Sequence, residues 1–126
     1  MLSENSVAPT IAVKDLSKAR KFYEGSLGLK QISMMGDDAI LYKSGNTKIM
    51  VYRSAYAGTN EATAMSWEVG DVEAEVRALK GKGITFEHYN NLPGMTLQGD
   101  IHVGGGMKEA WFKDPDGNIL NLSTVN

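Results

Sequence analysis

The feature that most constrains this sequence is a short motif that occurs twice. Val13-Lys14-Asp15-Leu16 and Val69-Gly70-Asp71-Val72 each end an apolar run at a valine and continue into a helical pattern. An aspartate at a helix start accepts free backbone N–H groups of the first turn and lies favourably at the positive end of the helix dipole. The copies are about half of the 126-residue chain apart. That long period with only two copies indicates a duplicated module rather than a solenoid.

Each copy introduces the same order of elements. Apolar residues at spacings of three and four predict a helix over 15–27, which Gly28 ends, and a second helix over 71–82. Alternating patterns separated by Gly-, Asp- and Asn-rich turns predict strands that form hairpins. The predicted strands are 7–13, 29–34, 39–43 and 48–53 in the first copy, and 63–69, 84–88, 109–113 and 118–123 in the second.

The predicted fold is therefore α+β, with two βαβββ modules at about residues 6–54 and 62–124. A single helix covers one face of each sheet and leaves the other face open. We expect the two modules to form one domain over residues 1–126, as a curled mixed sheet around a central hollow. The irregular stretch 89–106 is predicted to be a long loop, because it contains Pro93-Gly94 and three consecutive glycines (104–106).

Composition restricts the class of partner. There are 13 Lys and Arg residues against 15 Asp and Glu residues, so the net charge of −2 does not indicate a nucleic-acid or anionic-membrane surface. The absence of cysteine excludes disulfides, thiolate nucleophiles and cysteine zinc sites. No apolar run reaches membrane-spanning length, and the polar N-terminus does not resemble a signal peptide. We expect a cytoplasmic protein that binds neither nucleic acid nor membranes.

Two segments resemble a known family. The sequence VKDLSKARKFYEGSLGL (13–29) is similar to the first module of the vicinal oxygen chelate superfamily, and AWFKDPDGNIL (110–120) resembles its closing hairpin. That superfamily includes glyoxalase I, extradiol dioxygenases, fosfomycin-resistance enzymes and bleomycin-resistance proteins. The resemblance covers nearly the whole chain and implies a glyoxalase/bleomycin-resistance-like fold and a homodimer. It does not decide function, because the fold hosts both chemistry and simple binding.

Enzymes of this family hold a divalent metal with side chains from both modules. The resemblance carries those ligand positions to Ala8, Ala64 and Asn121, and to a position near Met50. A methyl group has no lone pair, and an amide oxygen is a weak neutral donor beside a carboxylate or an imidazole. The inherited metal site is therefore predicted to be absent, and we expect no cofactor.

Period-two alternation predicts which side chains line the hollow instead. If Ile11, Val13, Trp67 and Val69 face the helices, the intervening residues face inward, and Tyr89 and His102 join them from the long loop. The lining mixes small, apolar and hydrogen-bonding groups, which suits an organic ligand better than a bare cation. The predicted ligand-binding residues are Thr10, Met50, Tyr52, Ser66, Glu68, Tyr89, His102 and Asn121.

Several of these residues have alternative interpretations. His102, with Glu68 or Glu109, could form a replacement metal site or supply a general base. The favoured interpretation makes both histidines solvent-facing, His88 at a strand end and His102 in the glycine-rich loop. Glycines 104–106 lack the Lys-Ser or Lys-Thr and the helix of a phosphate loop, so a flap over the hollow is preferred. The side of the sheet on which Trp111 lies is left open.

We predict metal-independent binding of a small organic ligand, similar to that of bleomycin-resistance proteins. The first alternative is a glyoxalase-type lyase or isomerase, or a dioxygenase-like enzyme, with a displaced metal site. The second is a ligand-free assembly module. The missing metal ligands favour binding over catalysis, and the long loop with Tyr89 favours a ligand over assembly. Whether the chain is an enzyme stays open at this point.

Overall fold

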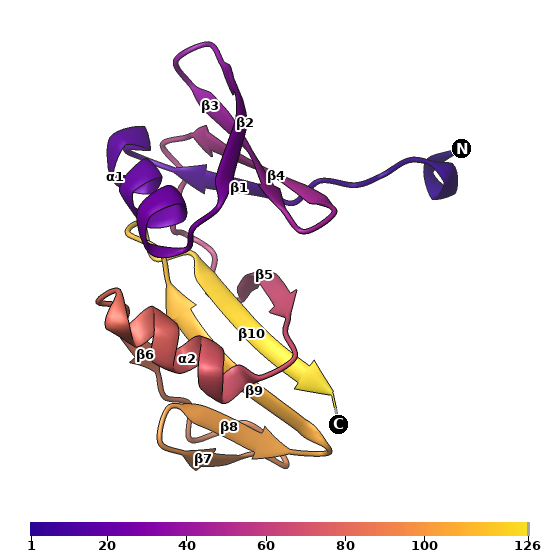
Figure 1. Ribbon diagram of the computed structural model, residues 1–126, viewed down its shortest axis with the longest axis vertical. Coiled ribbons are helices and arrows are strands. Elements are labelled where there is room, and N and C mark those ends of the chain that lie inside the picture. The colour runs from indigo at the N-terminus through magenta and orange to yellow at the C-terminus, as the bar shows by residue number, and fades with distance from the viewer. Residues whose placement is uncertain (126) are drawn as a thin grey trace. The chain divides into compact units, whose positions relative to one another are not determined.

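The chain folds into two compact units, one over Met1–Thr59 (unit 1) and one that begins at Asn60 (unit 2). A computed structural model describes the backbone of residues 1–125 and the side chains of residues 1–124. Each unit contains one mixed sheet and one main helical segment (Figure 1), so the predicted α+β class and the two βαβββ modules are confirmed. Their closure into one domain around a common hollow stays a prediction.

Unit 1 contains a four-stranded sheet in the order β1-β4-β3-β2. Strands β1 and β4 are parallel, and the other neighbours are antiparallel. Its elements are a 3-10 helix (Leu2–Glu4), β1 (Thr10–Val13), α1 (Leu16–Arg20) with a π-helical continuation (Lys21–Ser26), β2 (Lys30–Met35), β3 (Ala39–Ser44) and β4 (Thr47–Arg53).

Unit 2 repeats this arrangement of four strands and one helical segment, called the frame below, and adds a hairpin to it. Strands β5, β10, β9 and β6 pair as β1, β4, β3 and β2 do, while a hairpin of β7 and β8 joins the edge of β9 beside β6. The elements are β5 (Thr63–Glu68), α2 (Val72–Gly81), β6 (Phe86–Glu87), β7 (Thr96–Gln98), β8 (Ile101–Gly104), β9 (Met107–Lys113) and β10 (Ile119–Val125).

The repeated aspartates cap the helices as the sequence predicts. The Asp15 carboxylate accepts the backbone N–H groups of Ser17 at 2.9 Å and Lys18 at 3.2 Å, and Asp71 accepts that of Ala74 at 3.0 Å. Each interaction satisfies N–H groups that have no partner within the helix. The motif therefore fixes where each helix starts, directly after the first strand of its module.

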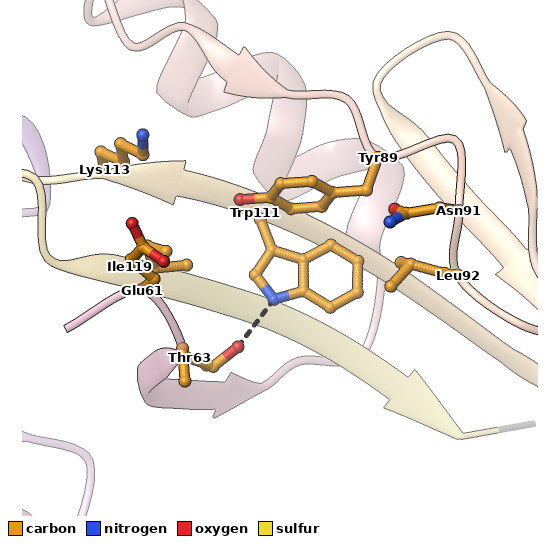
Figure 2. Close-up of a pocket in the computed structure, with 9 residues that line it drawn as sticks. Glu61, Thr63, Tyr89, Asn91, Leu92, Trp111, Lys113 and Ile119 are labelled. Carbon is orange, nitrogen blue, oxygen red and sulfur yellow. Dashed lines mark hydrogen bonds between the residues drawn. The ribbon is translucent and has the colours of Figure 1, made fainter.

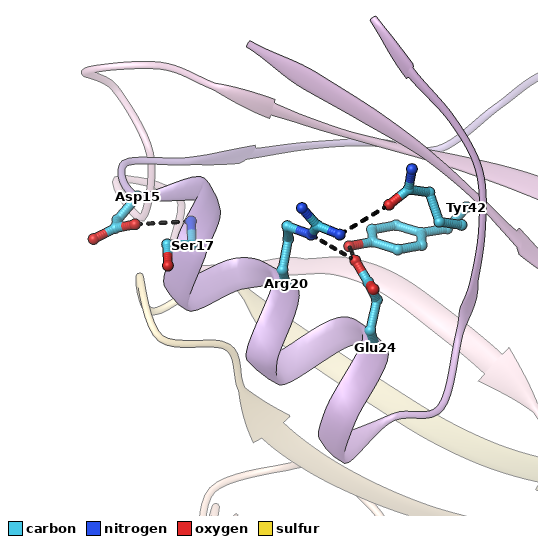
Figure 3. A network of polar contacts seen from close by, with 6 residues as sticks. Asp15, Ser17, Arg20, Glu24 and Tyr42 are labelled. Atoms are coloured by element: carbon cyan, nitrogen blue, oxygen red, sulfur yellow. Dashed lines mark hydrogen bonds and ion pairs between the residues drawn. The ribbon is translucent and has the colours of Figure 1, made fainter. Parts of the chain in front are cut away.

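A polar network links the helical segment of unit 1 to its sheet (Figure 3). The hydroxyl of Tyr42 on β3 donates to the Glu24 carboxylate at 2.7 Å, and Arg20 donates to the same carboxylate at 3.0 Å. Burial, followed by the hydrogen bond to Glu24, raises the pKa of Tyr42. The Tyr42 hydroxyl is therefore a hydrogen-bond donor that the surrounding structure satisfies.

The helix-facing side of each sheet forms the core, as alternation predicts. Tyr23 stacks on Tyr42 in unit 1, and Trp67 stacks on Phe112 in unit 2, with ring centroids 6.2 and 6.4 Å apart. The buried apolar strand residues are Ile11, Val13, Ile40, Tyr42, Ile49 and Val51 in unit 1, and Met65, Phe86, Ala110, Phe112, Leu120 and Leu122 in unit 2. Thr10, Met50 and Tyr52 share the opposite face of unit 1, because they occupy the alternate positions of β1 and β4.

Some predicted boundaries are wrong. Strand β1 begins at Thr10 rather than at residue 7, because Pro9 has no N–H with which to extend the ladder. The stretch 89–106 is not one irregular loop, since its second half forms the β7–β8 hairpin. None of the helices in the described residues is long and apolar enough to cross a membrane.

The predicted flap at glycines 104–106 is also wrong. Gly104 ends β8, and a Cβ there would lie 2.0 Å from the carbonyl oxygen of Gly94, so only glycine permits this backbone approach. Gly105 and Gly106 form the turn into β9 with φ of 58° and 74°. This glycine run therefore closes a hairpin and packs a loop against it.

Candidate functional site

The helix-free face of unit 2 brings together polar and aromatic side chains. The strand registers place Ser66, Asn121 and Trp111 in one row across β5, β10 and β9. The adjacent row contains Glu68, Ser123, Glu109 and His102. Side chains that pair directly across strands point to the same side of the sheet. This face is called the open face of unit 2 below.

Three rings gather at one end of the open face. Trp111 contacts Tyr89 edge-to-face with ring centroids 5.5 Å apart, and it contacts His102 in the same way at 5.0 Å. Tyr89 and His102 lie 5.8 Å apart. The indole N–H of Trp111 donates to the hydroxyl of Thr63 at 3.0 Å (Figure 2). The tryptophan is thus fixed by β5 on one side and by the ring cluster on the other.

His102 is not the solvent-facing loop residue that the sequence interpretation favoured. It lies on β8 and is 0% exposed. Its Nε2 accepts the backbone N–H of Tyr89 at 3.0 Å. The error arose because glycines on its C-terminal side indicated a loop, whereas they form the turn that returns β8 to β9.

A pocket of about 580 Å³ opens beside these rings, entirely within unit 2. Figure 2 shows Tyr89 and Trp111 as its aromatic wall, with Asn91 and Leu92 on the loop that follows Tyr89. Its lining residues are Glu61, Ala62, Thr63, Tyr89, Asn91, Leu92, Trp111, Lys113 and Ile119. A concave site of this size that combines aromatic and apolar walls with polar groups is typical of small-molecule sites.

Charged groups surround the Tyr89 ring. Lys113 lies 3.4 Å from the Glu87 carboxylate, and both side chains are partly exposed. Burial raises the pKa of Tyr89, and the charge of Glu87 adds to this while Lys113 opposes it. Tyr89 therefore presents a neutral phenol to the pocket across the physiological pH range.

The predicted site residues divide between the two units. Thr10, Met50 and Tyr52 lie on the helix-free face of unit 1, and the Thr10 hydroxyl donates to the Ala8 carbonyl at 3.1 Å. Ser66, Glu68, Tyr89, His102 and Asn121 belong to unit 2. Tyr89 lines the pocket and His102 supports it. The binding role of all eight stays a prediction.

The Asn121 side chain is buried and hydrogen-bonded to two neighbouring strands. It is 2% exposed, its Oδ1 accepts the Ser66 hydroxyl, and its Nδ2 donates to the Ala110 carbonyl at 3.4 Å. The side chain therefore links three strands from within the sheet. Glu68 lies exposed at the end of β5.

The sequence interpretation missed most of the pocket. The sequence patterns leave the side of Trp111 open and do not identify the lining residues Thr63, Asn91, Leu92, Lys113 and Glu61. Alternation gives the missing signal for Trp111, because it lies between the buried residues Ala110 and Phe112 and must face the other way. The loop residues carry no comparable periodicity.

The positions that hold metal in the related enzymes do not fit a divalent cation here. They contain the methyl groups of Ala8 and Ala64, the thioether of Met50 and the engaged amide of Asn121. Hard or borderline cations prefer carboxylate and imidazole ligands. Across the described residues, no three His, Cys, Asp or Glu side chains gather as a metal-binding group. Of the replacement site suggested for His102 with Glu68 or Glu109, the structure pairs His102 with Glu109 across β8 and β9, and Nε2 of His102 already accepts the Tyr89 N–H.

A separate ionic cluster holds the β7–β8 turn. Asp100 lies 2.7 Å from the Lys80 ammonium at the end of α2 and 2.7 Å from Nε2 of His88. Lys80, followed by His88, lowers the pKa of Asp100. His88 is half-exposed, which agrees with its predicted position at a strand end. The cluster links the hairpin to the rest of unit 2.

Known structures share this fold. A glyoxalase family protein from Enterococcus faecalis is 18% identical with a TM-score of 0.74, over 98% of this chain and 99% of that one. Lactoylglutathione lyase from Agrobacterium tumefaciens is 16% identical with a TM-score of 0.70, over 95% and 92%. The fosfomycin resistance protein FosX from Listeria monocytogenes is 14% identical with a TM-score of 0.71, over 97% and 93%.

Identities this low establish similarity of fold alone. No curated protein matches the chain at a significant level. The family model described as Glyoxalase/Bleomycin resistance protein/Dioxygenase superfamily matches residues 5–122, which is nearly the whole chain. The chain therefore belongs to the Glyoxalase/Bleomycin resistance protein/Dioxygenase superfamily.

Proposed function

We propose that this protein binds a small organic ligand in the unit 2 pocket and does so without a metal ion. The observation that carries the proposal is the pocket of about 580 Å³ beside Trp111 and Tyr89. Ligand sites of drug-sized molecules span roughly 300–1,000 Å³ and combine apolar walls with a few polar groups. Both properties are present here within one unit.

The lining favours a planar ligand with a polar substituent. Trp111, Leu92 and Ile119 offer apolar surface, and an aromatic ring can pack on an indole with about 0.5–1.5 kcal/mol beyond the burial of area. Asn91 and Lys113 offer hydrogen-bond donors, while the charge of Lys113 is balanced by Glu87 and the Glu61 carboxylate also lines the pocket. A planar aromatic molecule with a hydrogen-bond-accepting group is the ligand class that this lining supports best.

The proposed independence from metal rests on donor chemistry. In place of carboxylates and imidazoles, the inherited positions contain two methyl groups, a thioether and an amide that already bonds to Ser66 and Ala110. A ligand must then be held by the protein's own apolar surface and hydrogen-bonding groups. Metal analysis of protein purified without chelator provides the check. Stoichiometric nickel, zinc, iron or manganese would contradict this part and favour the enzyme alternative.

Fluorescence of 8-anilinonaphthalene-1-sulfonate, an aromatic anion with a planar naphthalene ring, tests the pocket directly. We expect saturable binding that EDTA does not change and that Tyr89→Ala or Trp111→Ala weakens at least about tenfold, or about 1.4 kcal/mol. Tyr56→Ala is the matched control, because Tyr56 is 81% exposed and lies outside the pocket. Binding that neither pocket variant changes would reject the pocket as the site.

Intrinsic fluorescence gives a second measurement. The chain has two tryptophans, and Trp67 packs on Phe112 in the core. A Trp67→Phe variant therefore leaves Trp111 as the reporter of the pocket. A library of aromatic compounds can then be screened by quenching and thermal shift, since a ligand at 100 times its Kd adds about 2.7 kcal/mol of stability. A library without any binder would favour the assembly alternative.

We also propose that the chain is a cytoplasmic homodimer whose partner is a small molecule rather than nucleic acid or a membrane. The support is the family resemblance and the net charge of −2. Light scattering coupled to size exclusion measures the first point. A mass of one chain, 13.7 kDa, rather than twice that value would contradict it.

A further inference from the structure

We infer that His102 is a positioning residue whose neutral imidazole holds Tyr89 in place and so sets the aromatic wall of the pocket. This inference rests on the proposed function, because the pocket is the site that the wall would serve. The role of His102 would then depend on the protonation state of its imidazole. A buried side chain that only fills space has no such dependence.

The hydrogen bond fixes the state of the ring. A backbone N–H is always a donor, so the Nε2 atom that lies 3.0 Å from the Tyr89 nitrogen must be an acceptor. The imidazole is then neutral, with its proton on Nδ1. A protonated ring carries an N–H on both nitrogens and cannot accept the bond.

His102 is buried against the two rings of the pocket wall. The residue is 0% exposed and contacts both rings of the pocket wall, Tyr89 at 5.8 Å and Trp111 at 5.0 Å between centroids. Its Nδ1 is buried without a hydrogen-bond partner in the described part of the chain. Burying an unpaired donor is destabilising. A histidine at this position is therefore better explained by what Nε2 does for Tyr89 than by stability.

Protonation of His102 should release Tyr89. The new Nε2–H would point at the Tyr89 N–H, so two donors would face each other where one bond existed. The groups that face the ring are the Glu109 carboxylate directly across on β9, the Tyr89 phenol on the loop and the apolar Leu97 on β7. Glu109 is the one negative charge among them. Acid should thus open the wall and weaken the pocket.

Binding of 8-anilinonaphthalene-1-sulfonate at two pH values tests this step. We compare about pH 7.5 with about pH 5, the range in which histidine ordinarily changes its charge while the sulfonate does not. The wild-type protein should bind about tenfold more weakly at the lower pH. His102→Gln keeps a neutral acceptor near the Nε2 position, so it should bind well at the higher pH and lose little affinity at the lower one. His102→Leu should bind weakly at both.

Glu109→Gln sharpens the test. This variant should still lose affinity at the lower pH, because Nε2 of His102 still faces the Tyr89 N–H, whereas equal affinity at both pH values would assign the acid effect to Glu109 instead. A wild-type affinity that is equal at both pH values would overturn the inference. An equal loss in His102→Gln would overturn it too, because the acid effect would then arise elsewhere. Far-UV circular dichroism of each variant verifies that its secondary structure is retained.

A measurement without ligand separates this inference from the proposed function. In ¹⁵N-labelled protein, the Tyr89 amide resonance should titrate together with the His102 ring nitrogens, and His102→Gln should abolish that titration. If the dye does not bind but the two titrate together, the positioning role stands and the proposed function fails. If the dye binds and the Tyr89 amide does not follow His102, the proposed function stands and the positioning role is wrong.

Discussion

The two units share one frame and differ most in the connection between the second and third strands of that frame. In unit 1, β2 and β3 are joined by the three-residue turn Gly36-Asp37-Asp38. In unit 2, the corresponding strands β6 and β9 are separated by residues 88–106, which contain the β7–β8 hairpin. Tyr89, Asn91, Leu92 and His102 all belong to this insert (residues 88–106 from here on). The comparison shows that the duplicated frame builds the core, and that the insert supplies three of the nine pocket-lining residues together with the supporting His102.

The two cores correspond residue by residue. Tyr42 pairs with Ile49 on the neighbouring strand, and Phe112 pairs with Leu120 in the same position of unit 2. Tyr42 carries a hydroxyl that Glu24 accepts, whereas Phe112 is surrounded by Trp67 and Phe86. The same position is thus filled by a hydrogen-bonded ring in one unit and by an aromatic cluster in the other.

The largest effect is expected when the Phe112 ring in the core of unit 2 is removed. Phe112→Ala should lower the free energy of unfolding by about 3–5 kcal/mol, because it leaves a cavity beneath two other rings. In unit 1, Tyr42→Phe keeps the ring and removes only the hydrogen bond to the Glu24 carboxylate, at about 1.5–3 kcal/mol. Urea unfolding measures both. Equal losses would show that the two positions are not filled in the different ways described.

The second largest effect is expected when the insert is deleted. Replacing residues 88–106 with seven residues, four that continue β6 opposite residues 107–110 and the turn Gly-Asp-Asp, gives unit 2 a short connection like that of unit 1. Binding of 8-anilinonaphthalene-1-sulfonate should weaken about a hundredfold, or about 2.8 kcal/mol, because Tyr89 and His102 are lost together. Far-UV circular dichroism should retain the helix signal, since α2 packs on β9 and β10. Undiminished binding by a folded variant would place the ligand site on the shared frame.

The repeated frame was predictable because several local signals agree. Asp15 and Asp71 cap the helices, glycines stop them, and alternation assigns the buried face of every long strand. The same alternation placed Thr10, Met50 and Tyr52 on one face of unit 1. Periodicity works here because each long strand has one buried and one open side.

The pocket was not predictable in the same way. Three consecutive glycines and Pro93 in the insert indicated irregular chain, while β7 and β8 are too short for their alternation to stand out. The burial of His102 depends on tertiary contacts with Tyr89 and Trp111, which no local pattern encodes. Trp111 itself could have been placed, because both of its neighbours are core residues.

The helix caps give a smaller effect that tests the duplication itself. Asp15 accepts two backbone N–H groups and Asp71 accepts one. Asp15→Ala and Asp71→Ala should each lower the free energy of unfolding by about 0.5–2 kcal/mol. Asp15→Ala should give the greater loss, because it leaves two N–H groups without their acceptor. Substitution by Asn at either position is the control that retains an acceptor. A loss in only one unit would show that the motif caps one helix and is incidental in the other.

The smallest expected effect concerns how the insert is held. The frame is held by buried apolar side chains, whereas Asp100 of the insert is held by the Lys80 ammonium and His88. The pKa of Asp100 is lowered in the folded state, chiefly by Lys80. Its contribution is therefore fully present above the unfolded value of about 3.9 and is lost as pH falls through the lower folded value.

Because Lys80 is more than half exposed, solvent screens the pair, and Asp100→Asn should cost roughly 1 kcal/mol or less at neutral pH. The difference between wild type and variant should vanish in strong acid, below the folded pKa. Hydrogen exchange should detect faster opening of β7 and β8 in the variant, with the amides of β9 and β10 unchanged. Faster exchange in β10 would show that the charges support the whole sheet, and the contrast between an apolar frame and an ionically tied insert would then fail.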